Sequence, residues 1–256
     1  MISVFTPSHN PLWLDQCHES LRTQTLWDWE WIVLLNGDAE WECDDPQVRI
    51  YRFPRSGTVG LMKAVACTHA SGSILVELDH DDVLLPDALM EIDRAFSENP
   101  TATLVYSDFA QMFEDGTPDE SDFDLRNGWE STPEYYEGQT YKRWRAPKPW
   151  PVNVGLIWFA PNHIRAFRTS TYHEVGGYDP NRRVLDDQDL MMRLYMRGPF
   201  IHIDRLLYLV RVHDGNTQKD PELNAQIQWE TVQMYCQQRE ALHLAYMSHN
   251  GLIQLQ

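Results

Sequence analysis

The chain has 256 residues, of which 43% are apolar and 23% charged, and its formal net charge is −17. This length fits one large domain or two closely fused ones, and the composition is that of an ordinary globular protein. The negative charge opposes generic binding to nucleic acids or anionic membranes, and no apolar run approaches the length of a membrane span.

The N-terminus enters a strand-like segment at once, without a cleavable signal, and this favours a cytoplasmic protein. The four cysteines show no close pairing. They indicate neither a zinc site nor a disulfide framework, and they fit a reducing compartment.

The first part of the chain alternates strand-like apolar runs with helical patterns. Strands are expected at 2–5, 31–35, 48–53, 74–78 and 104–106, with helices beginning near residues 11, 57 and 86. Strands that alternate with helices predict an α/β layer fold with a mainly parallel sheet. Polar segments follow three of these strands, at 6–10, 36–38 and 79–82. Because ligands bind beyond the carboxyl ends of such strands, one crevice is expected to hold all three segments.

The run Asp79-His80-Asp81-Asp82 directly follows the strand expected at 74–78, which reads as buried on both faces. Residues two apart in an extended chain project to one side, so Asp79 and Asp81 are expected to direct two carboxylates at one point. Such oxygen ligands suit Mg²⁺ or Mn²⁺, which usually also bind substrate phosphates. The alternative is an acidic turn that caps the helix expected from Pro86.

The pattern becomes irregular between about residues 110 and 152. This stretch contains a basic aromatic cluster at 141–145, followed by Lys148 and Trp150. The cluster is expected either to contact a sugar face or an acceptor phosphate, or simply to pack as a surface loop. Beyond it, a helix is expected at 187–197, one or two strands within 200–213, and a helical tail from 221 to about 248.

These motifs, taken in order, resemble the family-two glycosyltransferases of the GT-A fold. The resemblance lies in residues 2–10, 19–25, 29–33, 72–89, 175–179, 185–190 and 211–216. It implies a Rossmann-like α/β fold with a mostly parallel central sheet flanked by helices and a C-terminal helical tail. It also implies a nucleotide-sugar-binding half at 1–110, an acceptor-binding half at 111–216 and the tail at 217–256.

The resemblance implies transfer of a sugar from a nucleoside-diphosphate sugar to an acceptor hydroxyl, with Mn²⁺ or Mg²⁺ as cofactor. Asp81 would bind the metal directly. Asp79 would contact the ribose or the water shell of the metal, and His213 would supply another metal or diphosphate contact. A histidine that merely occupies the turn after a strand is the alternative for His213.

The resemblance also implies a donor site. Thr6, Pro7 and His9 fall where the family contacts the nucleotide base, partly through backbone groups. Asn36 stands where relatives often have an aspartate that bonds the base, and an amide leaves the choice of base open. Lys63 aligns with a basic residue that approaches the diphosphate, with a solvated helix lysine as the alternative.

Asp187 is the candidate base that removes the proton of the acceptor hydroxyl, and Asp186 is the second choice. A base at this position implies inversion at the anomeric carbon. The alternative is an acidic first turn that favours a helix N-terminus. His163, Arg165 and Arg168 lie in a segment that lines the acceptor cleft in relatives.

Two other functions remain open. A sugar-nucleotide pyrophosphorylase needs a glycine-rich loop after the first strand, and residues 6–11 contain no glycine. A non-catalytic sugar-nucleotide- or carbohydrate-binding module is disfavoured by the joint presence of Asp79, Asp81, Asp187 and His213. The overall acidity favours a glycan or a lipid-linked saccharide over nucleic acid as the acceptor.

Overall fold

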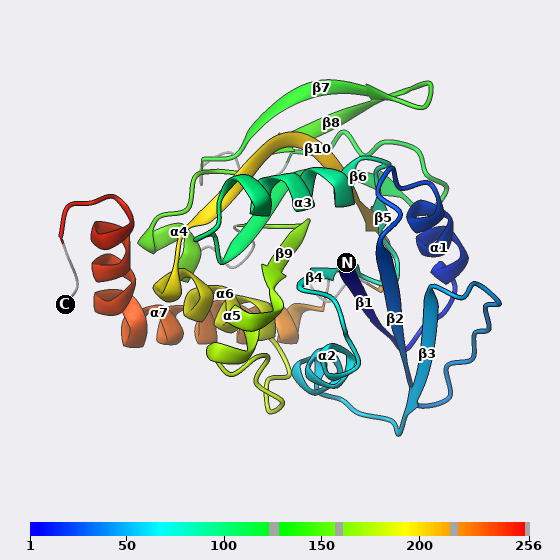
Figure 1. Cartoon of the computed structure of the whole chain (residues 1–256), viewed down its shortest axis with the longest axis horizontal. Helices are drawn as coiled ribbons and strands as arrows, with labels where there is room; N and C mark the ends of the chain where they lie inside the picture. Colours follow the sequence, from blue (N-terminus) through cyan, green and yellow to red (C-terminus); the bar gives the residue numbers. More distant parts are fainter. Residues whose placement is uncertain (123–127, 157–160, 216–219, 254–256) are drawn as a thin grey trace.

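A ten-stranded sheet forms the centre of the computed structural model, which describes residues 1–122, 128–156, 161–215 and 220–253 (Figure 1). Its strands are β1 (Ile2–Ser8), β2 (Trp29–Asn36), β3 (Val48–Phe53), β4 (Ile74–Glu77), β5 (Val83–Leu84), β6 (Leu104–Phe113), β7 (Glu130–Tyr136), β8 (Gln139–Arg145), β9 (Arg165–Arg168) and β10 (Phe200–Val212). The helices are α1 (Leu14–Arg22), α2 (Val59–Thr68), α3 (Ala88–Glu98), α4 (Pro151–Gly155), α5 (Thr169–Glu174), α6 (Asp186–Arg197) and α7 (Pro221–His249).

The N-terminal part of the sheet is parallel, in the spatial order β3-β2-β1-β4. Strand β4 is buried on both faces, and β2 is buried along its whole length except at its last residue. A strand buried on both faces needs helices on both sides of the sheet. This burial explains why both strands consist mainly of apolar residues. The α/β layer fold with a mainly parallel sheet is thus confirmed.

The second part of the sheet mixes directions, in the order β4-β9-β6-β10-β5. Strand β9 is antiparallel to both β4 and β6, and β10 is parallel to β6 with two register shifts between Ile203 and Tyr208. Strand β9 was not predicted; its four residues begin and end with arginine. The expected division after residue 110 falls inside β6.

The segment expected to be irregular contains an antiparallel hairpin, so that expectation was wrong. Strands β7 and β8 pair from Glu130–Arg145 to Tyr136–Gln139 and project at the top of Figure 1. The turn residues Glu137 and Gly138 both have positive φ angles, 47° and 81°, which suits a two-residue hairpin turn.

Helix α2 confirms the helix expected to begin near residue 57. Val59 is 43% exposed, whereas Lys63 is buried together with Met62. The helix makes a close contact at Gly60, where an added Cβ would lie 2.1 Å from the carbonyl oxygen of Asp179. Only glycine allows the helix to approach this backbone.

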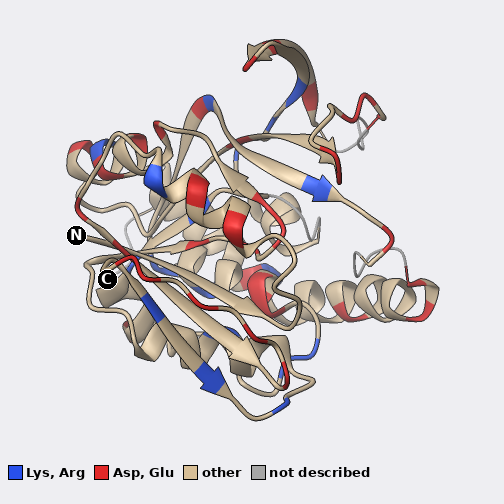
Figure 2. Cartoon of the chain, turned by 90° about the vertical axis from the view of Figure 1, so that its right-hand side faces the viewer, with Lys and Arg blue, Asp and Glu red and all other residues tan. Residues whose placement is uncertain are grey.

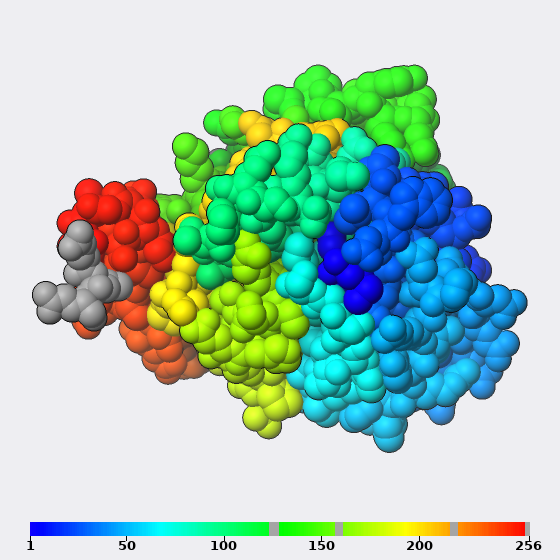
Figure 3. Space-filling model, viewed as in Figure 1, coloured from blue at the N-terminus to red at the C-terminus, as the bar shows by residue number. Residues whose placement is uncertain are grey.

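Helix α7 confirms the predicted helical tail. The Asp220 side chain accepts hydrogen bonds from the backbone N–H groups of Glu222 and Leu223, which caps the helix. The helix packs against α4 and α6. Its last turns stand out from the body of the molecule (red in Figure 3). Within the described ranges, no helix is both long and apolar enough to cross a membrane.

Candidate functional site

The three polar segments that follow β1, β2 and β4 lie at one edge of the sheet, as predicted. These strands are parallel neighbours, with β1 between the other two. Their carboxyl ends therefore meet where residues 6–10, 36–38 and 79–82 leave the sheet.

The acidic run 79–82 forms a tight turn. The N–H of Asp82 donates to the carbonyl oxygen of Asp79 over 3.3 Å, so the expected extended geometry was wrong. The carboxylates of Asp79 and Asp81 consequently have different partners. Within the described part of the chain, the ligand atoms of Asp79, Asp81 and His213 do not all lie within 4.8 Å of one another.

Asp82 is buried and fixes this turn to β10. Its carboxylate accepts a hydrogen bond of 2.7 Å from the backbone N–H of Arg211, whose guanidinium donates to the carbonyl oxygen of Asp81 over 2.7 Å. Burial, together with the charges of Asp81 and Asp79, raises the pKa of Asp82 well above its usual value. Asp82 therefore has a structural role and does not begin a helix, since β5 follows it directly.

Asp81 faces His213 at the end of β10. The His213 Nε2 atom lies 2.8 Å from Oδ2 of Asp81, and the ring centroid lies 4.9 Å from that of Trp13. The N–H of Gly215 donates to His213 Nδ1 over 3.1 Å, which directs Nε2 toward the carboxylate. Together with the Asp79 side chain, which is 39% exposed, this pair offers two carboxylates and one imidazole. Such a donor set fits Mn²⁺ or Mg²⁺.

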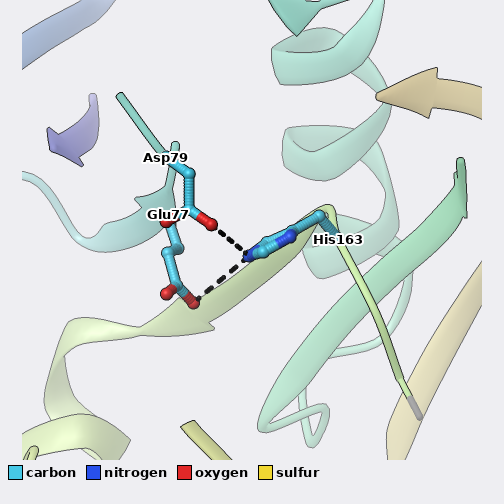
Figure 4. A group of neighbouring side chains, drawn as sticks. All are labelled: Glu77, Asp79 and His163. Carbon is cyan, nitrogen blue, oxygen red and sulfur yellow. Dashed lines mark ion pairs between the residues drawn. The ribbon is translucent and has the colours of Figure 1, made fainter. Parts of the chain in front are cut away.

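Among the described residues, Glu77, Asp79 and His163 form a group whose metal-ligating atoms do all lie within 4.8 Å of one another (Figure 4). The His163 Nε2 atom lies 3.6 Å from Asp79 Oδ2 and 3.9 Å from Glu77 Oε2. However, Glu77 already pairs with Lys63 and Arg165, and a guanidinium nitrogen of Arg165 lies 2.5 Å from the same His163 nitrogen. These two cations make the group a poorer site for a divalent cation than the Asp81–His213 pair.

The side chains at the end of β1 differ in their access to the crevice. Thr6 is fully buried; its hydroxyl donates to the carbonyl oxygen of Leu78 and accepts from Trp31 Nε1, both over 2.8 Å. Thr6 thus has only backbone groups to offer a ligand. His9 is exposed, and its ring lies edge-on to His80 with 4.9 Å between centroids. Partial desolvation of the ring and the neighbouring His80 both lower the pKa of His9.

Asn36 lies at the end of β2, where its amide binds the backbone of Ser56. Its Nδ2 donates to the Ser56 carbonyl oxygen and its Oδ1 accepts from the Ser56 N–H, each over 2.8 Å. These two hydrogen bonds fix the loop that leads into α2. The structure therefore engages the Asn36 side chain in ordering a loop at the crevice.

Lys63 is not a solvated helix lysine. Its Nζ lies 2.5 Å from Glu77 Oε1 and 2.8 Å from Asp186 Oδ2, and its side chain is 9% exposed. Burial alone would lower the pKa of Lys63, but Asp186 and Glu77 outweigh it and raise the pKa well above its usual value. These contacts place the charge in the core beneath the crevice.

Arg165, at the start of β9, has a separate partner for each of its guanidinium nitrogens. Its Nε lies 3.0 Å from Glu77 Oε2, and its Nη1 lies 2.6 Å from Asp187 Oδ2. The third nitrogen, Nη2, faces His163. The acceptor-side candidate Asp187 is thereby joined to Asp79 through two side chains.

The adjacent residues Asp186 and Asp187 have opposite electrostatic environments. For Asp187, burial favours the neutral form, but Arg165 and then Lys63 outweigh it and lower the pKa. For Asp186, burial raises the pKa, and Lys63 does not fully offset burial and the charge of Asp187. Asp187 is consequently the better carboxylate at neutral pH.

The basic aromatic cluster on β8 packs into the structure. Tyr141 and Trp144 are buried, and Arg143 forms ion pairs with Asp108 and Asp204. Neither aromatic ring has a face free for a sugar. Arg168 likewise donates to backbone carbonyl oxygens, those of Ala102, Phe96 and Asn99.

Sequence reasoning missed Glu77 and Arg211. Glu77 is 1% exposed and lies at the centre of the buried ion pairs, and Arg211 is equally buried. One signal was available, because Glu77 is a charged residue inside an apolar strand and such residues are rarely buried without a partner. Arg211 lies in the segment 211–216 that carries the family resemblance, but no role was assigned to it.

Charged groups elsewhere in the chain are mostly acidic. Figure 2 shows red acidic positions on helices, strands and loops in this view, in keeping with 38 acidic and 21 basic residues in the sequence. The candidate site therefore places two basic side chains in a protein that is acidic overall. Lys63 and Arg165 form ion pairs with the carboxylates of Glu77, Asp186 and Asp187.

Known proteins share both the sequence pattern and the fold. A chondroitin synthase of Pasteurella multocida is 24% identical over 226 residues, which cover 85% of this chain and 21% of the synthase. The crystal structure of S. aureus TarS 1–349 in complex with UDP-GlcNAc is similar with a TM-score of 0.67 and 14% identity, over 96% of this chain and 72% of that one. The mannosyltransferase PcManGT of Pyrobaculum calidifontis, in complex with GDP-Man and Mn²⁺, has a TM-score of 0.64 and 14% identity, over 96% and 69%.

This chain thus spans about a fifth of the length of that synthase (21%). The structural neighbours share the GT-A architecture predicted from the sequence. The model of the family described as Glycosyl transferase family 2 matches residues 3–157, more than half of the chain. The chain therefore belongs to glycosyl transferase family 2 and has the GT-A fold.

Proposed function

We propose that this chain transfers a sugar from a nucleoside-diphosphate sugar to a hydroxyl group of a glycan or a lipid-linked saccharide. The contacts that link Asp187 through Arg165 and His163 to Asp79 carry this proposal. They connect Asp187, the candidate proton acceptor, with Asp79 at the edge of the sheet where the donor would bind. The UDP-GlcNAc and GDP-Man of the neighbouring structures support such a donor.

Asp81 and His213 would hold a divalent cation, Mn²⁺ or Mg²⁺, and Asp79 would contact the ribose or the water shell of the metal. When bound, the cation supplies positive charge for the diphosphate leaving group. The Mn²⁺ in the mannosyltransferase complex supports this assignment. Arg211 and Asp82 contribute by holding the turn that carries Asp81.

Asp187 accepts the proton of the acceptor hydroxyl in this proposal. Its lowered pKa keeps it a carboxylate at neutral pH, as a base must be. Direct attack by the deprotonated hydroxyl inverts the configuration at the anomeric carbon. Asp186 is the second choice, because its pKa is raised and Lys63 occupies its carboxylate.

The donor base would lie at the ends of β1 and β2. His9 offers an exposed imidazole, and Thr6 offers only its backbone. The Pro7 carbonyl oxygen lies 3.4 Å from Nδ1 of His80. Asn36 contributes through the loop that it orders at Ser56. Lys63 stabilises Asp186 and Glu77 in this proposal and does not contact the diphosphate.

The test is to incubate the protein with Mn²⁺ and each of UDP-GlcNAc, UDP-glucose, UDP-glucuronate and GDP-mannose, with and without saccharide acceptors. Release of nucleoside diphosphate that depends on acceptor and stops with EDTA is the expected result. Thermal stabilisation by a donor without turnover would favour a binding module. Production of nucleoside triphosphate from the donor and pyrophosphate would favour a pyrophosphorylase.

A further inference from the structure

The buried ion pairs of Lys63 and Arg165 form one continuous chain of contacts. It runs from Asp186 through Lys63, Glu77 and Arg165 to Asp187. The two ends of this chain are adjacent in sequence, at the start of α6. The ion pairs therefore close a ring that ties α2, β4, β9 and α6 together.

Arg165 has the position in this ring that bears most directly on Asp187. It lies opposite Glu77 in the antiparallel pairing of β9 with β4, and its side chain is 5% exposed. A buried guanidinium is stable only when its nitrogens are paired. Because its planar fork fixes the direction of each contact, Arg165 defines where the Asp187 carboxylate lies.

The backbone at the start of α6 gives Asp187 a second constraint. Leu185, which precedes the two aspartates, has a φ of 58°, in the left-handed region that bulky residues avoid. Such conformations persist only where surrounding contacts hold them. Here Asp186 pairs with Lys63 and Asp187 pairs with Arg165, so the two neighbouring aspartates face different cations.

We infer that Arg165 is a positioning residue for the transfer reaction, which holds the Asp187 carboxylate in place to receive the proton of the acceptor hydroxyl. This inference rests on the proposed function. It adds that β9, through Arg165 and His163, connects the proton acceptor with Asp79 at the donor edge. In this proposal Arg165, whose side chain is 5% exposed, acts through Asp187.

The charges that face Asp187 come from four elements. They are Arg165 from β9, Lys63 from α2, Glu77 from β4 and Asp186 from α6 itself. Arg165 is the larger of the two cationic influences that lower the pKa of Asp187. Without it the pKa rises, and the carboxylate form required of a base is lost at a higher pH.

The experiment compares Arg165→Gln and Arg165→Lys with wild type, using the sugar nucleotide and acceptor that give turnover in wild type. Arg168→Gln is the matched control, because it changes an arginine of the same strand whose contacts are backbone carbonyl oxygens near α3. The readouts are kcat, the KM for the donor, the pH dependence of kcat/KM, and donor binding by thermal shift.

For Arg165→Gln we expect kcat to fall roughly 100-fold, as misplacement of a reacting group does. The acid limb of the pH profile should move up by roughly 1 to 3 pH units, because an arginine neighbour lowers an aspartate pKa by about that much. For Arg165→Lys, which keeps the charge and loses the fork, kcat should fall while the acid limb stays in place. Donor binding should persist in both variants.

Loss of stability alone would lower activity without moving the acid limb, and Arg168→Gln measures that effect. If Arg165→Gln does not fold, Arg165→Lys decides: an unchanged kcat, or a fall caused by lost donor binding, overturns the inference. An acid limb that is the same in wild type and Arg165→Gln also overturns it. Absence of turnover in wild type would instead contradict the proposed function.

Discussion

The Nε2 atom of His213 lies 2.8 Å from Oδ2 of Asp81, although 132 positions separate the two residues in the chain. The contact exists because β10 ends beside the turn that follows β4. Arg211, two residues before His213, binds the same turn through its backbone N–H and its guanidinium. The end of β10 thus completes the site that the acidic run begins.

Replacement of Asp81 by alanine should abolish metal-dependent donor binding. Loss of a partner that only orients a ligand costs 10- to 100-fold in metal affinity, so loss of a direct ligand should cost at least roughly that much. Donor affinity is measured by titration calorimetry with and without Mn²⁺. Asp28→Ala, which removes an exposed carboxylate at the N-terminus, is the control. Wild-type affinity in Asp81→Ala would refute the ligand assignment.

Replacement of Asp187 by asparagine should leave donor binding nearly intact and reduce transfer by roughly 10²- to 10⁴-fold, the usual contribution of a general base. The amide keeps the shape of the side chain but cannot accept a proton. Steady-state kinetics and donor thermal shifts measure the two effects separately. Asp186→Asn is the comparator: if it collapses transfer while Asp187→Asn does not, the base is Asp186.

Replacement of Lys63 by methionine should destabilise the fold by about 3–5 kcal/mol, because it leaves the buried carboxylates Glu77 and Asp186 without their shared cation. Lys142→Met removes an ion pair with the exposed Asp122 and should cost about 0–1 kcal/mol. Denaturant unfolding of both variants measures the difference. Equal losses would mean that the Lys63 pairs are no stronger than surface contacts.

Acid should destabilise the protein partly through Glu77. Burial raises the pKa of this carboxyl, but Arg165 and Lys63 outweigh burial and hold the pKa well below its usual value of 4.5. The unfolded chain therefore binds a proton first as the pH falls. The stabilisation is fully present above about pH 4.5 and is lost as the pH falls toward the folded-state pKa.

Urea unfolding between pH 7 and pH 3 tests this point. In Glu77→Gln the dependence of the unfolding free energy on pH should be shallower below about pH 4.5, because one titrating group is removed. An identical slope in wild type and variant would assign the acid sensitivity to other carboxylates.

Local sequence patterns predicted the parallel half of the sheet and the meeting of three polar segments at its edge. The apolar runs of β2 and β4 and the helical spacing of α1 report burial directly, and turn residues mark the strand ends. Strand β9 escaped prediction because two arginines bound its four residues, a pattern typical of solvent-exposed chain. Its place between β4 and β6 depends on pairing with distant segments, which no local pattern encodes.

The sequence by itself determined which charged residues follow the strands and in what order, and hence the family and the candidates Asp81, Asp187 and His213. Only the tertiary structure decided how charges pair. In the folded chain Lys63 is buried in the core, and Arg165 forms an ion pair with Asp187. The physical reason is that an ion pair depends on the distance and burial of its two charges, and both are set by packing between segments far apart in the chain.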